Sequence, residues 1–264
     1  MKSIITRGLI CLKDKIGIEY AVSYIEYELW ENGEYEYRFE PIYSVIDLLD
    51  ETLFQGIPGL NLEKRRRVYI RKNTVPVFIS ERSPSENREE LWELLESCSM
   101  QYLNRLEWLI RTDTKYIGDN LYVKRTDENP AGKTADIKEK ISKLKRSCDV
   151  EKTLLEYVCR GYNVNTDTFL INDNNRYSCY SLLYMLYSKD RSHILNRQSD
   201  GIKKAKEEKK YKGRKRLELD DVQLYNAWNK YKDGKINASE AAKTVNISMS
   251  TFYRRIKEYE SDRS

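Results

Sequence analysis

Apolar and polar residues near the start of the chain follow a pattern that is typical of β-strands. The stretches 18–30 and 34–41 are rich in tyrosine and β-branched residues. Between them, Asn32-Gly33 is a strong signal for a tight hairpin turn. The pattern therefore predicts an antiparallel pair of strands.

Further elements follow before residue 126. Apolar residues recur every three or four positions in three segments, which predicts helices at 43–51, 85–98 and 102–110. The second of these opens close to a capping box at Ser85. The apolar run 74–80 is interpreted as a buried strand, and 118–125 as a closing strand. Together these elements predict a mixed α/β domain over residues 1–125.

The polar segment 126–136 contains proline and glycine and is the predicted domain boundary. Helical patterns follow at 137–146 and 150–160, within a helical region, 137–211. Its last helix is expected to begin near Tyr177 and to run past Lys206. One side of this helix carries a mostly apolar stripe of Leu183, Tyr187, Ile194, Gln198, Ile202 and Ala205. Such a stripe needs a partner, either the core of this chain or a second copy of it.

The last part, 212–264, has the signals of three short helices, so the predicted fold class is α+β. Asn237 and Glu240 form a capping box, and Ala241 and Ala242 allow another helix to come close. In the next turn Ile247 is expected to point inward and Ser248 to cap the last helix. Phe252 and Ile256 should face the core of this domain. Upstream, a helix ending at Gly234 is expected to use an apolar face of Val222, Tyr225 and Trp228.

This arrangement is typical of a helix-turn-helix, whose second helix lies in the DNA major groove. Ser250, Thr251 and Arg254 are left outward at its start. An ordinary three-helix bundle and a peptide-binding module are the alternatives. The charge distribution favours DNA, because the segment 201–216 has nine basic and two acidic residues in a chain of net charge +5. A solvated tether is the competing interpretation of that segment.

Residues 190–257 resemble the C-terminal region of serine recombinases, the resolvases and invertases. The matching features are Arg-x-x-x-Gly-Ile from Arg197, the Gly-Arg-Lys block, and the Ala-Ala and Ser-Thr-x-Tyr-Arg positions. The resemblance implies a minor-groove arm of Gly213 and Arg214, with Lys215 beside it. It also implies a recognition helix over 249–259. In that helix Ser250 and Arg254 would contact bases, and Thr251, Tyr253 and Arg255 would contact phosphates.

The catalytic motif of that family, Tyr-x-Arg-x-Ser, does not occur in the N-terminal sequence, so no catalytic residue is expected. Residues 20–125 faintly resemble the N-terminal subdomain of HipA-like proteins. A ligand-sensing domain and a partner-binding domain are alternatives for this part. A third is a metal-dependent nuclease that would use Asp149, Glu151 and Lys152.

Five cysteines without a Cys-x-x-Cys pair and the lone His193 indicate a reducing compartment, no metal and no cofactor. No apolar run reaches the roughly 20 residues that span a bilayer, so a cytoplasmic protein without a membrane partner is expected. The function predicted is a sequence-specific regulator of transcription in a bacterial or mobile-element genome. Its partners would be double-stranded DNA, a second copy bound through the 178–206 helix, and a small-molecule or protein effector on the N-terminal domain. A DNA-acting enzyme, either a degenerate recombinase or a nuclease, is the alternative.

Overall fold

The structure is a computed structural model that describes residues 3–116, 118–166, 168–208 and 219–261. It divides the chain into two compact units, Met1–Gln198 and Ser199–Ser264. Helices and an antiparallel sheet occur together, which confirms the α+β class. The predicted boundary at 126–136 lies inside the first unit. Cys159, beyond that boundary, belongs to the same core as the sheet, and its carbonyl accepts a 2.9 Å hydrogen bond from the Ala21 amide.

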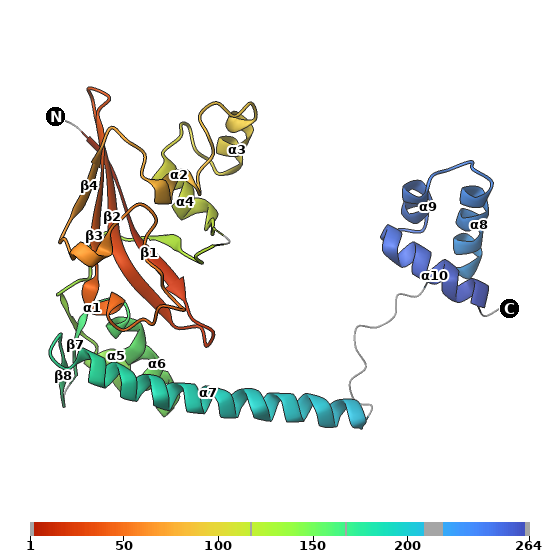
Figure 1. The fold of residues 1–264 in the computed structure, drawn as a ribbon. Helices are drawn as coiled ribbons and strands as arrows, with labels where there is room; N and C mark the ends of the chain where they lie inside the picture. The colour runs from red at the N-terminus through yellow and green to blue at the C-terminus, as the bar shows by residue number, and fades with distance from the viewer. Residues whose placement is uncertain (1–2, 117, 167, 209–218, 262–264) are drawn as a thin grey trace. The chain divides into compact units, whose positions relative to one another are not determined.

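The first unit is built on a five-stranded antiparallel sheet with the order β4-β3-β2-β1-β5 (Figure 1). Its strands are β1 (Ser3–Lys13), β2 (Glu19–Trp30), β3 (Tyr35–Pro41), β4 (Tyr69–Lys72) and β5 (Tyr122–Arg125). The predicted hairpin joins β2 to β3. There the Gly33 amide donates to the Trp30 carbonyl at 3.0 Å, and Gly33 has a φ of +82°, a conformation that favours glycine.

Short helices follow the strands of this sheet. They are α1 (Tyr43–Ile46), the 3₁₀ turn η1 (Leu62–Lys64), α2 (Val77–Ser80), α3 (Leu91–Ser97) and α4 (Arg105–Thr112). The strand predicted at 74–80 is wrong, because α2 begins there directly after Pro76. Proline cannot donate to a sheet but suits the entry to a helix, and the turn after it buries Phe78 and Ile79.

Helix boundaries also differ from the prediction; α4, for example, begins three residues after the expected start at 102. The helix expected at 43–51 ends at Ile46 and continues only as turns. The helix expected from Ser85 begins six residues later, at Leu91. The Ser85 hydroxyl accepts only a 3.3 Å bond from the Asn87 amide, so the capping box at this position does not form.

The rest of the first unit is a smaller layer. The three-stranded sheet β6-β7-β8 comprises β6 (Thr134–Asp136), β7 (Asn163–Asn165) and β8 (Leu170–Ile171). The two helices expected here are present, with shifted ends, as α5 (Lys138–Ser142) and α6 (Ser147–Val158). The buried guanidinium of Arg176 donates to the carbonyls of Val158 at 3.1 Å and Tyr162 at 2.8 Å. These hydrogen bonds hold the end of α6 and the residues that follow it.

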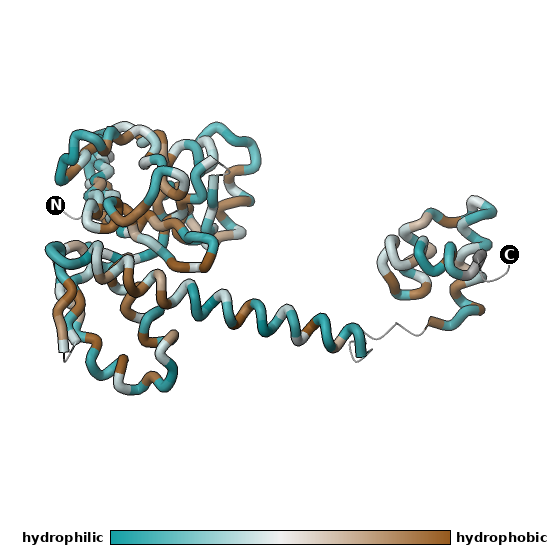
Figure 2. The backbone as a smooth tube through the Cα atoms, turned by 60° about the horizontal axis from the view of Figure 1, so that its bottom comes forward, coloured by the Kyte–Doolittle hydropathy of each residue, from teal (hydrophilic) through white to brown (hydrophobic). Residues whose placement is uncertain are grey.

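The long helix α7 spans Arg176–Glu207, close to the predicted bounds. Its beginning packs on the core through Tyr180, Leu183, Tyr184 and Tyr187, and the hydroxyl groups of Tyr180 and Tyr20 lie 2.9 Å apart. Farther along, polar and apolar residues alternate (Figure 2) and Ile202 is 51% exposed. The predicted stripe is therefore divided: Leu183 and Tyr187 pack on the core of this chain, whereas Ile202 is exposed.

The second unit contains α8 (Asp221–Lys232), α9 (Ala238–Thr244) and α10 (Met249–Ser261). These three helices surround a small core of Leu224, Ala227, Ala241, Ala242, Phe252 and Ile256. In the described part of the chain, no helix has the length and apolarity needed to span a lipid bilayer.

Candidate nucleic-acid interface

The first helix of the second unit, α8, is fixed at both ends by local hydrogen bonds. The Asp220 side chain accepts from the Val222 amide at 2.9 Å. At the other end, the Lys235 amide donates to the Lys230 carbonyl and Gly234, with a φ of +71°, donates to Tyr231. This pair of bonds is a Schellman motif, which satisfies carbonyls that the helix itself leaves open. The predicted end at Gly234 is confirmed.

The face that α8 buries differs from the prediction. Leu224 and Ala227 are buried and Trp228 partly buried, whereas Val222 is 68% exposed. The predicted set, which also included Tyr225, was spaced by three residues throughout. That spacing drifts around a helix of 3.6 residues per turn. The buried residues keep to one stripe because Ala227 and Trp228 follow Leu224 by three and four residues.

The second helix, α9, begins with the predicted capping box. The Asn237 side chain accepts from the Glu240 amide at 2.9 Å, and the Glu240 carboxylate accepts from the Asn237 amide at 2.9 Å. Ala241 and Ala242 are buried between the helices, as expected. Their small side chains allow the backbones of the three helices to approach one another.

The turn between α9 and α10 is a second Schellman motif, and its left-handed residue is an asparagine. Asn246 has a φ of +53°, its amide donates to the Lys243 carbonyl at 3.0 Å, and the Ile247 amide donates to the Ala242 carbonyl at 3.0 Å. Ile247 packs on the core, as predicted. This turn sets the angle at which α10 leaves α9.

The start of α10 is capped and free of carboxylates. The Ser248 hydroxyl accepts from the Thr251 amide at 3.3 Å and lies 2.9 Å from the Thr251 hydroxyl. No acidic residue stands in the first turn of the helix. The helix N-terminus is therefore open to an anion, which the helix dipole and the first amides favour.

One face of α10 is exposed and basic. Ser250, Arg254 and Lys257 are exposed and are separated by four and three residues, so they form one strip along the helix. Lys257 was missed in the sequence, although its spacing from Ser250 and Arg254 could have identified it. Phe252 and Ile256 are buried on the other side, as predicted.

Arg255, which was expected to contact phosphate, is only 9% exposed. It follows Phe252 by three residues and therefore lies on the same inward face. Its guanidinium lies 3.4 Å from the Glu258 carboxylate. The charge of Arg255 is therefore less open to solvent than that of the exposed Arg254.

Two other proposed phosphate contacts lie at the side of the strip. Tyr253 is exposed, but its hydroxyl lies 3.3 Å from that of Tyr231, and this hydrogen bond raises the pKa of Tyr253. Thr251 is half-buried and bonded to Ser248. The predicted arm residues Gly213, Arg214 and Lys215 lie outside the described residues.

The residues of the nuclease hypothesis do not converge. Asp149 forms two 2.8 Å hydrogen bonds with the Arg146 guanidinium, and Lys152 lies 3.8 Å from the Glu156 carboxylate. Within the described ranges, His, Cys, Asp and Glu side chains form no group of three or more that could hold a metal ion. The geometry adds no support to that hypothesis.

Comparison with known proteins adds no assignment: no protein-family model matches this sequence, and no curated protein matches it.

Proposed function

We propose that this chain is a sequence-specific double-stranded DNA-binding protein that regulates transcription, with α10 as its major-groove helix. The observation that carries the proposal is the exposed strip of Ser250, Arg254 and Lys257 on α10, which follows α9 after a tight turn. Hydroxyl and guanidinium groups at this place can reach base edges and phosphates.

Two further features support DNA as the partner. The resemblance of residues 190–257 to the DNA-binding region of serine recombinases concerns the same three helices. The basic excess of the chain also lies beside them, at 201–216. In the proposed arrangement Arg214 enters a minor groove while Arg254 reads the adjacent major groove.

The decisive experiment is selection of bound sites from random DNA with the full chain, repeated with Arg254→Ala. A bidentate arginine–guanine contact discriminates against other bases by about 1–3 kcal/mol. We therefore expect the variant to lose preference at one base position as well as affinity. Lys232→Ala, which removes one exposed charge from α8, is the matched control and should keep the preference.

If Arg254→Ala weakens binding to all sequences equally, Arg254 contacts phosphate and the assignment of the reading residue is wrong. If the full chain selects no sequence, the proposed function itself fails. Incubation of supercoiled target plasmid with Mg²⁺ separates the regulator from a DNA-acting enzyme, since only the enzyme would nick or linearise the plasmid.

The proposal includes a homodimer formed through α7. Leu195 and Ile202 are seven residues apart, so they lie on one face, and they are 49% and 51% exposed. Apolar residues at this spacing pack well against a second helix. A dimer would bring two DNA-binding units to one DNA site, and that site should then be a palindrome or a direct repeat.

The mass of the full chain, measured by light scattering during size-exclusion chromatography, tests whether it forms a dimer. The double substitution Leu195→Glu with Ile202→Glu should reduce the mass from two chains to one. The matched control is Leu182→Glu, an exposed leucine on the same helix but on a different face. An unchanged mass in the first variant would exclude this helix face as the interface.

A further inference from the structure

The outer edge of β1 is open over its first half. Strand β5 pairs with β1 only over Gly8–Cys11, and within the described ranges no other strand lies beside Ser3–Arg7 on that side. Ile4 and Ile5 on this stretch are 48% and 42% exposed. A cavity of about 390 Å³ lies along this edge. The open half of β1 is therefore one wall of a space that is large enough for a small ligand.

The facing wall of this cavity comes from a turn and a helix. Residues 99–102 precede α4, and Glu107 and Arg111 stand on α4 itself. Arg125 joins them from the end of β5. These three are the charged side chains that line the cavity, so two cations face one anion.

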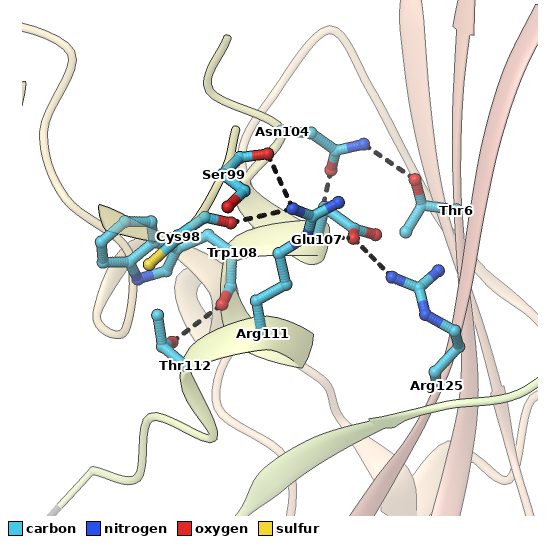
Figure 3. A network of polar contacts seen from close by, with 9 residues as sticks. All are labelled: Thr6, Cys98, Ser99, Asn104, Glu107, Trp108, Arg111, Thr112 and Arg125. Atoms are coloured by element: carbon cyan, nitrogen blue, oxygen red, sulfur yellow. Dashed lines mark hydrogen bonds and ion pairs between the residues drawn. The ribbon is translucent and has the colours of Figure 1, made fainter. Parts of the chain in front are cut away.

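Both arginines are bound to the same oxygen (Figure 3). Arg111 donates through Nε to Glu107 Oε1 at 2.6 Å, and Arg125 donates through Nη2 to that same atom. Burial alone would raise the pKa of the Glu107 carboxyl, but the hydrogen bonds from Arg125 and Arg111 outweigh this and lower the pKa. The group of three therefore has a net charge of +1. Among the described residues that line the cavity, Glu107 is the only acidic one.

The surrounding contacts hold this group in position. Arg111 also donates through Nη1 to the carbonyls of Cys98 at 2.8 Å and Ser99 at 2.9 Å. Asn104 is buried: its Oδ1 accepts from the Glu107 amide at 3.0 Å, and its Nδ2 donates to Thr6 Oγ1 at 2.8 Å (Figure 3). A ligand would thus meet guanidinium groups that are already oriented, which reduces the entropy lost on binding.

Some donors of these two arginines remain available. Arg125 Nε and Nη1, and Arg111 Nη2, make no hydrogen bond to another described residue. Each of these groups can donate a charge-assisted hydrogen bond to a carboxylate, and such bonds are stronger than those between neutral groups. A monoanion would neutralise the net charge of +1, whereas a dianion would leave excess negative charge beside Glu107.

We propose that this cavity binds a small organic acid, with its carboxylate on Arg125 and Arg111 and its apolar part on Ile4 and Tyr102, since Ile4 shares the sheet face of Thr6. Tyr102 is 48% exposed at the cavity wall, so apolar surface and cationic groups meet in the same space. The proposal concerns the first unit alone and does not depend on DNA binding. It gives that unit a ligand of defined chemistry.

The test follows isoleucine δ1-methyl NMR signals of the full chain. The probes are acetate, butanoate, hexanoate and 4-phenylbutanoate, each with its uncharged amide. We expect the longer acids to shift the Ile4 signal saturably, with the amides at least about tenfold weaker. Ile70, 42% exposed on the opposite edge strand β4, is the internal control. If no acid shifts the Ile4 signal, or if acids and amides act alike, the proposal is wrong.

Paired substitutions locate the binding groups. Arg125→Gln should weaken the longest acid about tenfold or more. Arg7→Gln should not, because Arg7 pairs with Glu26 and does not line the cavity. Ile4→Glu should abolish binding by adding a negative charge at the apolar wall, while Ile70→Glu should leave it unchanged. Equal affinities of the native chain and a folded Arg125→Gln variant would overturn the assignment.

Discussion

The two units build their cores from contacts of different range. In the first unit, β1 pairs with β5, so that Gly8 stands opposite Arg125, and the core extends from Ile10 to Cys159. In the second unit, all the buried core residues lie between Leu224 and Ile256. Local hydrogen bonds also fix the helix ends of the second unit. The comparison shows that local signals suffice for the second unit, whereas long-range pairing defines the first.

The largest expected effect comes from removing the centre of the smaller core. Phe252→Ala should cost about 3–5 kcal/mol, which is about as much as so small a core supplies. We expect the second unit to unfold and DNA binding to be lost, while the first unit keeps its native NMR signals. Phe39→Ala, in the main core, should destabilise the first unit instead. Loss of both sets of signals in either variant would show that the units do not fold separately.

Charge provides the next contrast, because the excess of basic residues lies in the tail. Replacing Lys209, Lys210, Lys212 and Lys215 with Gln should flatten the slope of log affinity against log salt by about 3–4 units. The preferred bases should stay the same. Binding titrations at 50–200 mM salt measure the slope. If the slope is unchanged, the segment is a tether and its lysines do not contact phosphate.

A pH-dependent effect is expected from Glu107 in the first unit. The folded pKa of Glu107 is depressed, so its ion pairs stabilise the unit above the unfolded pKa of about 4.3 and are lost as pH falls through the folded value. Glu107→Gln should therefore lower the unfolding free energy at pH 7, and the difference from the native chain should shrink towards pH 3. Urea titrations at both pH values measure this. Glu93→Gln, at an exposed position on α3, should show no such trend.

The smallest expected effect is the loss of stability when either of two helix-capping sequences is changed. Asn237→Ala removes a capping box that forms and should cost the second unit about 1 kcal/mol. Ser85→Ala removes one that does not form and should change the stability of the first unit by less than about 0.5 kcal/mol. Thermal unfolding of both variants decides this. Equal losses would mean that the sequence motif, and not its structural context, sets the cost.

Sequence alone determined most of the second unit. The capping box at Asn237, the end of α8 at Gly234 and the inward Phe252 and Ile256 are all confirmed. Each depends on residues within a few positions of one another, so the pattern contains the physical cause. The hairpin at Asn32-Gly33 and the extent of α7 followed for the same reason.

Tertiary structure decided the rest. Whether 74–80 forms a strand depends on a partner strand elsewhere in the chain, and here a helix begins after Pro76 instead. Whether Arg255 meets solvent depends on which side of α10 the other helices cover. The cavity beside β1 joins Ile5, Arg111 and Arg125, which only the pairing of distant strands and the packing of α4 bring together. A periodic pattern gives the local conformation, but the side that becomes buried is set by surfaces that come from elsewhere in the chain.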